Sequence, residues 1–200
     1  MRYRLTAVLL ATIVAGFMFC CTPKMDVGLG KAKGFSADLT VRSKMGPRTH
    51  VLKGKLYAAK NGNSRVDIPP YSINIVRRDK KVAWTLLPEQ KQYMEGPVKT
   101  ESAFYGGGEV PGEISRKKIG EEVIDGQRTK KYEIKYMAKA ITGKEVEDTM
   151  IQWISVDTGI PIKMALANGT ITYEYHNVKV GRQPDDLFEL PAGYTKMAMP

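Results

Sequence analysis

The side chains that could perform acid–base or metal chemistry are few and far apart in the sequence. The chain contains two histidines, His50 and His176, and two adjacent cysteines, Cys20 and Cys21. A zinc site needs three or four imidazole, thiolate or carboxylate ligands brought together. His50 lies beside a turn and His176 at the end of a predicted strand, where a lone histidine is more often a surface residue than a base. We therefore expect no enzymatic activity, no metal and no cofactor.

The carboxylates do not form a convincing catalytic pair either. The glutamates at 121–122 are adjacent in a predicted strand, so their side chains point to opposite faces. The aspartates at 185–186 fit the first turn of a helix, where acidic residues are favourable. Residues 145–148 form an acidic edge, but they lack the ligand spacing of a calcium loop. The glycines at 106–108 have no following lysine and helix, which a phosphate-binding loop requires.

The first 21 residues have the layout of an export signal. Arg2 and Arg4 precede an uncharged, apolar run over 5–21, which ends at the two cysteines. Three alternatives remain open. The chain is cleaved and acylated at Cys21 (or Cys20) as a bacterial lipoprotein, it is cleaved without acylation, or the apolar helix is kept as an anchor. Residues 22–34 then form a flexible linker rich in glycine.

The net charge is +10, from 31 basic and 21 acidic residues, and it falls to about +8 if the leader with Arg2 and Arg4 is removed. A basic exported protein is expected to meet anionic membrane surfaces or acidic partners. Solvated strand faces rich in lysine explain the same charge. Export makes nucleic acid a poor candidate for the partner.

The rest of the chain alternates with a period of two residues, which is typical of half-buried strands. In the first example Phe35, Ala37, Leu39 and Val41 share one face. Turn residues such as those at 61–62 and 125–126 separate the strands. Short helical turns are expected only at 98–105 and 184–188. The predicted strands are 35–42, 50–59, 65–68, 71–75, 82–86, 92–95, 119–124, 132–136, 145–155, 160–166 and 171–175.

Residues 35–200 therefore predict one mainly β domain, a single curved antiparallel sheet of roughly ten strands. A sheet this wide must curl or close, so we expect a half-barrel with an apolar hollow. The alternative is that the inner face packs shut as a core. The residues expected to line the hollow are Leu39, Leu56, Ile73, Trp84, Leu86, Ile134 and Trp153.

Three stretches resemble the LolA/LolB-like superfamily of exported bacterial proteins, and within it a domain family of unknown function. They are 82–95 (VAWTLLPEQKQYME), 153–163 (WISVDTGIPIK) and 187–194 (LFELPAGY). The resemblance implies a curved antiparallel sheet with a hydrophobic cavity. It also implies a role in carrying or receiving lipoproteins, or in sensing envelope stress through a partner. The long capping helix of the carriers has no counterpart in 23–34.

These observations lead to a binding protein of the periplasm or the outer membrane. Its expected ligand is a lipid, an acyl chain or a lipidated protein, held in the hydrophobic hollow. The alternative is an envelope interaction or stress-sensing protein that docks a polypeptide partner. The sequence leaves the identity of the ligand and the oligomeric state open.

Overall fold

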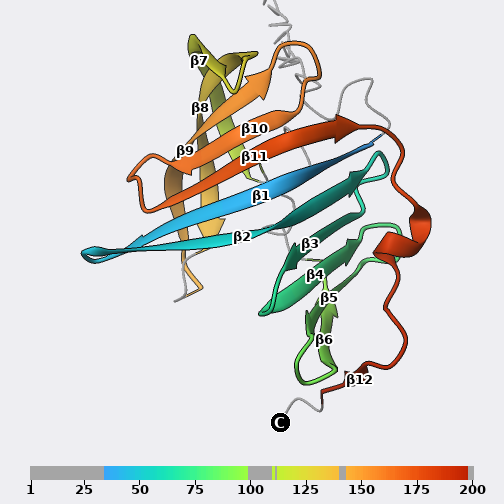
Figure 1. Cartoon of the computed structure of the whole chain (residues 1–200). Coiled ribbons are helices and arrows are strands. Elements are labelled where there is room, and N and C mark those ends of the chain that lie inside the picture. The colour runs from blue at the N-terminus through green and yellow to red at the C-terminus, as the bar shows by residue number, and fades with distance from the viewer. Residues whose placement is uncertain (1–33, 99–109, 111, 140–142, 198–200) are drawn as a thin grey trace, which may run out of the picture.

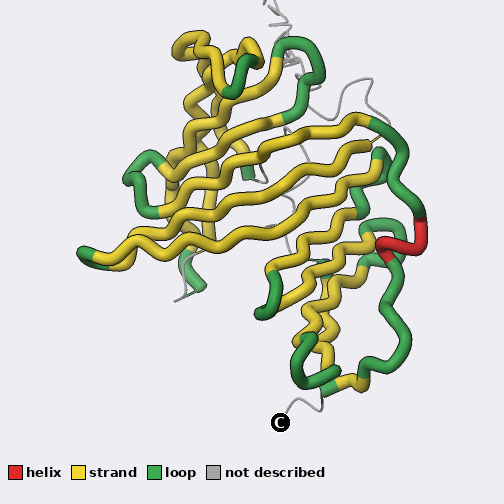
Figure 2. Tube along the Cα trace, in the orientation of Figure 1, coloured by secondary structure: helices red, strands yellow, loops and turns green. Residues whose placement is uncertain are grey.

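The computed structural model describes residues 34–98, 110, 112–139 and 143–197, and almost all of them belong to one sheet (Figures 1 and 2). The strands are β1 (Gly34–Met45), β2 (Arg48–Ala59), β3 (Ser64–Ile68), β4 (Ser72–Arg77), β5 (Val82–Leu87), β6 (Gln92–Pro97), β7 (Glu113–Ile124), β8 (Gln127–Lys139), β9 (Glu145–Ser155), β10 (Pro161–Leu166), β11 (Ile171–Val180) and β12 (Thr195–Lys196). A short 3₁₀ helix, η2, spans Asp185–Phe188.

The strand order is β12-β6-β5-β4-β3-β2-β1-β11-β10-β9-β8-β7. Two antiparallel meanders, β1 to β6 and β7 to β11, join where β1 pairs with β11. The chain therefore passes from one edge of the sheet at β6 to the opposite edge at β7. The two-residue β12 pairs with β6 and is parallel to it.

This connection requires the sheet to bend. Neighbouring strands lie about 4.8 Å apart, so a flat sheet would separate β6 from β7 by about 48 Å. The fifteen residues between Pro97 and Glu113 span about 50 Å only when fully extended. Val110, near the end of this connection, packs against Ile134, Tyr136 and Met150. We call the face that carries these three side chains the inner face, and the opposite one the outer face.

The register assigns the side chains of each strand to one of the two faces. Leu39 is opposite Tyr175 on β11, and Leu56 is opposite Val66 on β3; all four belong to the inner face. Ile75 is opposite Trp84, and both belong to the outer face. The apolar positions thus change face between β3 and β4.

The predicted fold class is confirmed: the protein is mainly β, with one open, curved, largely antiparallel sheet. There are twelve strands instead of roughly ten. β7 begins at Glu113, before the predicted start at 119, and the parallel β12 was not expected. The predicted helical turn near 184–188 is confirmed as η2. The expected leader and linker, and nearly all of the helical turn expected at 98–105, lie outside the described residues.

Within the described ranges, no helix is long and apolar enough to cross a membrane.

Candidate functional site: the apolar inner face

The inner face carries apolar side chains on seven neighbouring strands, β3, β2, β1, β11, β10, β9 and β8, which pack in two clusters. Each strand contributes its alternate side chains, because successive residues of a strand point to opposite faces. The cross-strand register aligns these contributions into rows. Its large buried apolar members include Phe35, Leu39, Leu56, Val66, Ile134, Met150, Met164 and Tyr175.

Large and adaptable side chains dominate the centre of this face. Phe35 and Tyr175 lie with their ring centroids 6.5 Å apart and tilted by 44°. Met164 is almost fully buried beside them. Aromatic rings provide much apolar area, and methionine adapts its shape to irregular partners. This composition suits contact with a flexible apolar chain.

A polar group interrupts the inner face toward the β7 edge. Arg116, whose side chain is only 3% exposed, donates to both carboxylate oxygens of Glu113 at 2.8 and 2.7 Å. It also donates to Oε1 of the buried Gln152 at 2.8 Å. Gln152 in turn donates to Sδ of Met164 at 3.5 Å. These groups satisfy one another, so they form a structural network and not a reactive centre.

Tyr136 borders the same part of the inner face. Burial, followed by the nearby Asp148 carboxylate, raises the pKa of the Tyr136 phenol to about 12. The phenol donates a hydrogen bond to Oδ2 of Asp148 at 3.4 Å. Tyr136 therefore stays protonated at neutral pH and acts as a hydrogen-bond donor, not as a base.

Three of the seven predicted lining residues lie on the inner face. Leu39 and Leu56 belong to its central cluster, and Ile134 packs under Val110 near the β7 edge. All three are at most 1% exposed.

The other four predicted residues belong to the outer face, so the seven do not surround one hollow. Ile73, Trp84 and Leu86 form a cluster on β4 and β5. The segment after β11 covers this cluster, with Phe188 buried at its centre. The contributions of this segment are Leu187, Phe188, Leu190 and Tyr194.

Arg77 at the end of β4 holds this covering segment through hydrogen bonds. Its guanidinium donates to both oxygens of Asp79 at 2.9 and 2.7 Å. It also donates to the Phe188 carbonyl at 3.4 Å and to the Glu189 carboxylate. The hydrogen bonds from Arg77 lower the pKa of both Asp79 and Glu189 below their usual values. We call Arg77, Asp79 and Glu189 the outer latch.

Trp153 occupies a different, polar part of the outer face. Its Nε1 donates to Glu122 at 2.7 Å. The amino groups of Lys131 and Lys163 lie 4.8 and 5.1 Å from the ring centroid, within the range of cation–π attraction. Lysines on both neighbouring strands, β8 and β10, thus lie against the ring of this tryptophan.

The residues considered for chemistry do not assemble into a reactive site. His50 is exposed, and Nδ1 of His176 pairs with Asp125 at 2.7 Å. Of the predicted acidic edge, Glu147 pairs with Lys135. Among the residues that the structure describes, no three histidine, cysteine or acidic side chains could hold a metal ion. Cys20 and Cys21 lie outside the described residues.

Several inner-face residues were not among the predicted lining positions. Phe35 alternates in phase with Leu39, so the same pattern could have identified it. Tyr173 and Tyr175 lie in the predicted strand 171–175, and both pack in the central inner cluster. Met164 follows a bulge in β10, which hides its phase from a simple alternation count.

Known structures align with most of this chain. A DUF1329 family protein from Desulfovibrio piger aligns with a TM-score of 0.46 and 13% identity, covering 80% of this chain and 91% of that protein. A LolA superfamily protein from Nitrosomonas europaea gives 0.42 and 12%, covering 80% and 91%. A domain named as a putative outer membrane lipoprotein-sorting protein, from Vibrio parahaemolyticus, gives 0.40 and 10%, covering 77% and 88%.

The superfamily that the sequence motifs resemble is thus represented among the aligned structures. No model of a protein family matches the sequence, and no curated protein matches it. At these identities and TM-scores, the alignments say nothing about ligand or partner.

Proposed function

We propose that this protein is a non-enzymatic binding protein of the bacterial cell envelope that holds an acyl chain, of a lipid or a lipidated protein, against the inner face. The observation that carries this proposal is the apolar inner face, whose side chains come from seven neighbouring strands and pack in two clusters. Such a face is normally covered by a second layer of helices or strands. In the described part of the chain, the one helix, η2, covers the outer face instead.

Burial of an acyl chain on this face would be energetically sufficient for binding. Each methylene removed from water contributes about 0.8 kcal/mol, so ten would contribute about 8 kcal/mol before association costs. The side chains of the central cluster are already buried. An acyl chain would therefore have to displace the groups that pack against these side chains. Met164 and the two tyrosines of β11 can adjust to a chain of variable shape.

A polypeptide partner is the second candidate, and the β7 edge favours it. β7 is twelve residues long and pairs only with β8 among the described residues. It exposes Ile114, Ile119 and Val123. An unpaired edge with apolar side chains can accept an added strand. However, the β7–β8 register shifts at Ile114 and at Ile119. Such irregularities bend the strand, so an added strand could not pair continuously along the whole of β7.

The cellular location follows from the first 34 residues and forms part of the proposal. We propose a leader over 1–21 and a linker over 22–34, which places the domain in the periplasm, tethered through Cys21 (or Cys20) if it is acylated. Measurement of the mass of the N-terminal peptide tests this, because an acylated cysteine, a free new terminus and an intact leader have different masses.

Photochemical labelling tests the acyl-binding proposal without altering the protein. A fatty acid with a diazirine on its chain would be added to the full chain, irradiated and mapped by tandem mass spectrometry. We expect labels on Met164, Tyr173 and Tyr175, which unlabelled fatty acid should compete away. Labels confined to outer-face residues, or labelling that excess fatty acid does not reduce, would overturn the proposal.

Lipid extraction of the natively purified protein should recover acyl chains. A tightly held polypeptide without lipid would favour the alternative in which a partner binds the β7 edge.

A further inference from the structure

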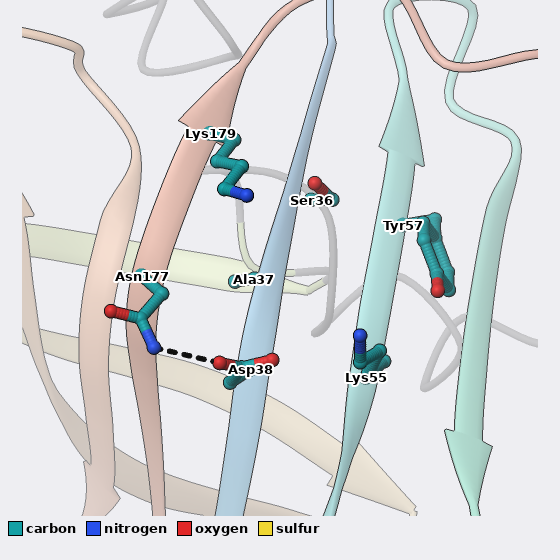
Figure 3. A pocket seen from close by; sticks show the side chains of 7 residues that line it. All are labelled: Ser36, Ala37, Asp38, Lys55, Tyr57, Asn177 and Lys179. Carbon is teal, nitrogen blue, oxygen red and sulfur yellow. Dashed lines mark hydrogen bonds between the residues drawn. The ribbon is translucent and has the colours of Figure 1, made fainter.

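A polar pocket of about 440 Å³ opens on the outer face across β11, β1 and β2 (Figure 3). It is on the side of the sheet opposite the apolar inner face, and Tyr57 separates it from the covered Trp84 cluster. The side chains that matter here are Ser36, Asp38, Lys55, Tyr57, Asn177 and Lys179.

The register explains why these six side chains converge. Ser36 on the central strand β1 is opposite both Lys179 on β11 and Tyr57 on β2. Asp38, two residues further along the same face, is opposite Lys55. Tyr57 also packs against the Trp84 cluster, so the rest of the fold holds its ring in place as a wall of the pocket.

A β-bulge in β11 brings the sixth side chain into the pocket. The β1–β11 register shifts between Ser36 and Asp38, and Asn177 at this shift has a φ of 50°. Asparagine tolerates this left-handed conformation better than most residues. Its Nδ2 donates to Oδ2 of Asp38 at 2.8 Å, as Figure 3 shows. Bulges commonly re-aim side chains next to functional sites.

The charges of the pocket are arranged to leave two cations available. Figure 3 shows the amino groups of Lys179 and Lys55 on either side of β1. Both lysines are exposed, and neither forms an ion pair within the described residues. Asp38 lies directly across from Lys55, but its carboxylate accepts a hydrogen bond from Asn177 on the other side. The six lining side chains therefore carry two lysines and one oriented carboxylate; Lys55 is also opposite Asp67 on β3, which accepts a hydrogen bond from Arg65.

We propose that this pocket binds a small phosphate ester that carries hydroxyl groups. Lys55 and Lys179 would contact the phosphate as point charges, a common use of lysine. The Ser36 hydroxyl would donate a hydrogen bond to the ester, and the Asp38 carboxylate would accept one from a ligand hydroxyl. A volume of about 440 Å³ is in the range of small-molecule sites and exceeds the needs of a bare phosphate ion. The ligand is either a soluble phosphate ester or the headgroup of a membrane lipid.

Titration of the folded full chain with two probes tests the proposal and separates the two sources. Glycerol 3-phosphate represents the soluble ester, and vesicles with phosphatidylglycerol, compared with vesicles of neutral lipid, represent the headgroup. Calorimetry measures binding of the soluble probe, co-sedimentation measures vesicle binding, and amide NMR shifts locate the soluble probe. We expect shifts at Ser36, Tyr57 and Asn177.

A matched pair of double variants distinguishes the pocket from general positive charge. Lys55→Gln with Lys179→Gln removes both pocket cations, and Lys53→Gln with Lys60→Gln removes two exposed lysines outside it. We expect the first to weaken binding by about tenfold or more, because it removes both charge-assisted hydrogen bonds to the phosphate, and the second by less than about twofold. Binding of glycerol 3-phosphate alone assigns a soluble ester, and vesicle binding with the same dependence on the variants assigns a headgroup. No binding of either probe, or equal loss in both double variants, would overturn the proposal.

This inference is independent of the proposed acyl site, because the two sites lie on opposite faces. A failed labelling experiment with fatty acid would leave the phosphate titration interpretable, and the reverse also holds.

Discussion

The two apolar regions of this sheet are built by the same alternating pattern and differ in what covers them. On the outer face, Trp84 and Leu86 lie under the chain's own C-terminal segment, which inserts Phe188 and is fastened by the outer latch. On the inner face, the apolar side chains come from seven strands, and Val110 and Ile160 are described residues outside the strands that pack with them. The first region is covered by the chain's own C-terminal segment, whereas the second draws its side chains from more strands.

This difference shows that burial alone does not identify a binding surface. Leu39 and Leu86 are equally buried, at 1% and 0% exposure. Their surroundings differ. Leu86 packs under the chain's own C-terminal segment, which includes Phe188. Leu39 packs among side chains from several strands of the inner face. The following changes test whether the two regions do differ in this way.

Removal of the Phe188 ring should have the largest effect. We expect Phe188→Ala to lower the free energy of unfolding by about 3–5 kcal/mol, because it leaves a cavity between the covering segment and the outer cluster. Urea denaturation followed by circular dichroism measures this. Leu187→Ala, at the neighbouring half-buried position, is the control and should cost clearly less. Equal, small losses in both variants would show that the C-terminal segment is not a structural cover.

A matched pair of leucine substitutions compares the two faces directly. Leu39→Ala and Leu86→Ala should each lower stability by about 2–5 kcal/mol, since both remove a buried side chain. At a temperature where both remain folded, only Leu39→Ala should change the affinity for a fluorescent fatty acid. If Leu86→Ala changes the affinity as much, the acyl site is not confined to the inner face.

Disruption of the outer latch should have an intermediate effect. Arg77→Met keeps much of the side-chain volume but removes the guanidinium that donates to Asp79, Glu189 and the Phe188 carbonyl. We expect a loss of about 2 kcal/mol in the free energy of unfolding, because the arginine side chain is only 10% exposed. Lys80→Met removes the exposed partner of the same glutamate and should cost at most about 0.5 kcal/mol. Similar losses in the two variants would contradict the role assigned to Arg77.

The sequence predicts the strands well because alternation and turn residues are local signals. The curl and the antiparallel pairing of neighbouring strands follow from the number of strands and the short turns. Alternation within one strand shows which of its residues share a face, but it does not show which face of the sheet they share. That phase depends on the turns and bulges between strands. For this reason Trp84 and Ile73 were predicted to line the same hollow as Leu39, although the change of face between β3 and β4 separates them.

The long-range features are the ones that the sequence does not reveal. The pairing of β1 with β11 joins segments more than 120 residues apart, and no local pattern encodes it. The outer latch joins residues 111 and 112 positions apart. The polar pocket depends on a bulge at Asn177, a residue whose neighbours simply continue the strand pattern. Such sites become visible only when the register is known.

Mild acid should weaken the outer cover more than the inner face. The hydrogen bonds from Arg77 lower the folded-state pKa of Asp79 and Glu189. A carboxylate with a lowered folded-state pKa stabilises the fold fully above its unfolded value, and it loses that contribution as the pH falls toward the folded value. The outer latch should therefore weaken progressively below about pH 4.5, the ordinary value for glutamate.

Fluorescence of Trp84 can report this loosening, because the chain contains two tryptophans and Trp153→Phe leaves Trp84 alone. We expect its emission to shift toward longer wavelengths below about pH 4.5, before global unfolding is detected by circular dichroism, since the covering segment excludes water from the indole. In an Arg77→Met background, Asp79 and Glu189 lose the hydrogen bond that contributes most to their lowered pKa, so the acid-dependent part of this shift should become clearly smaller. A shift that persists unchanged in that background would assign the acid sensitivity to other carboxylates and remove the outer latch as its cause.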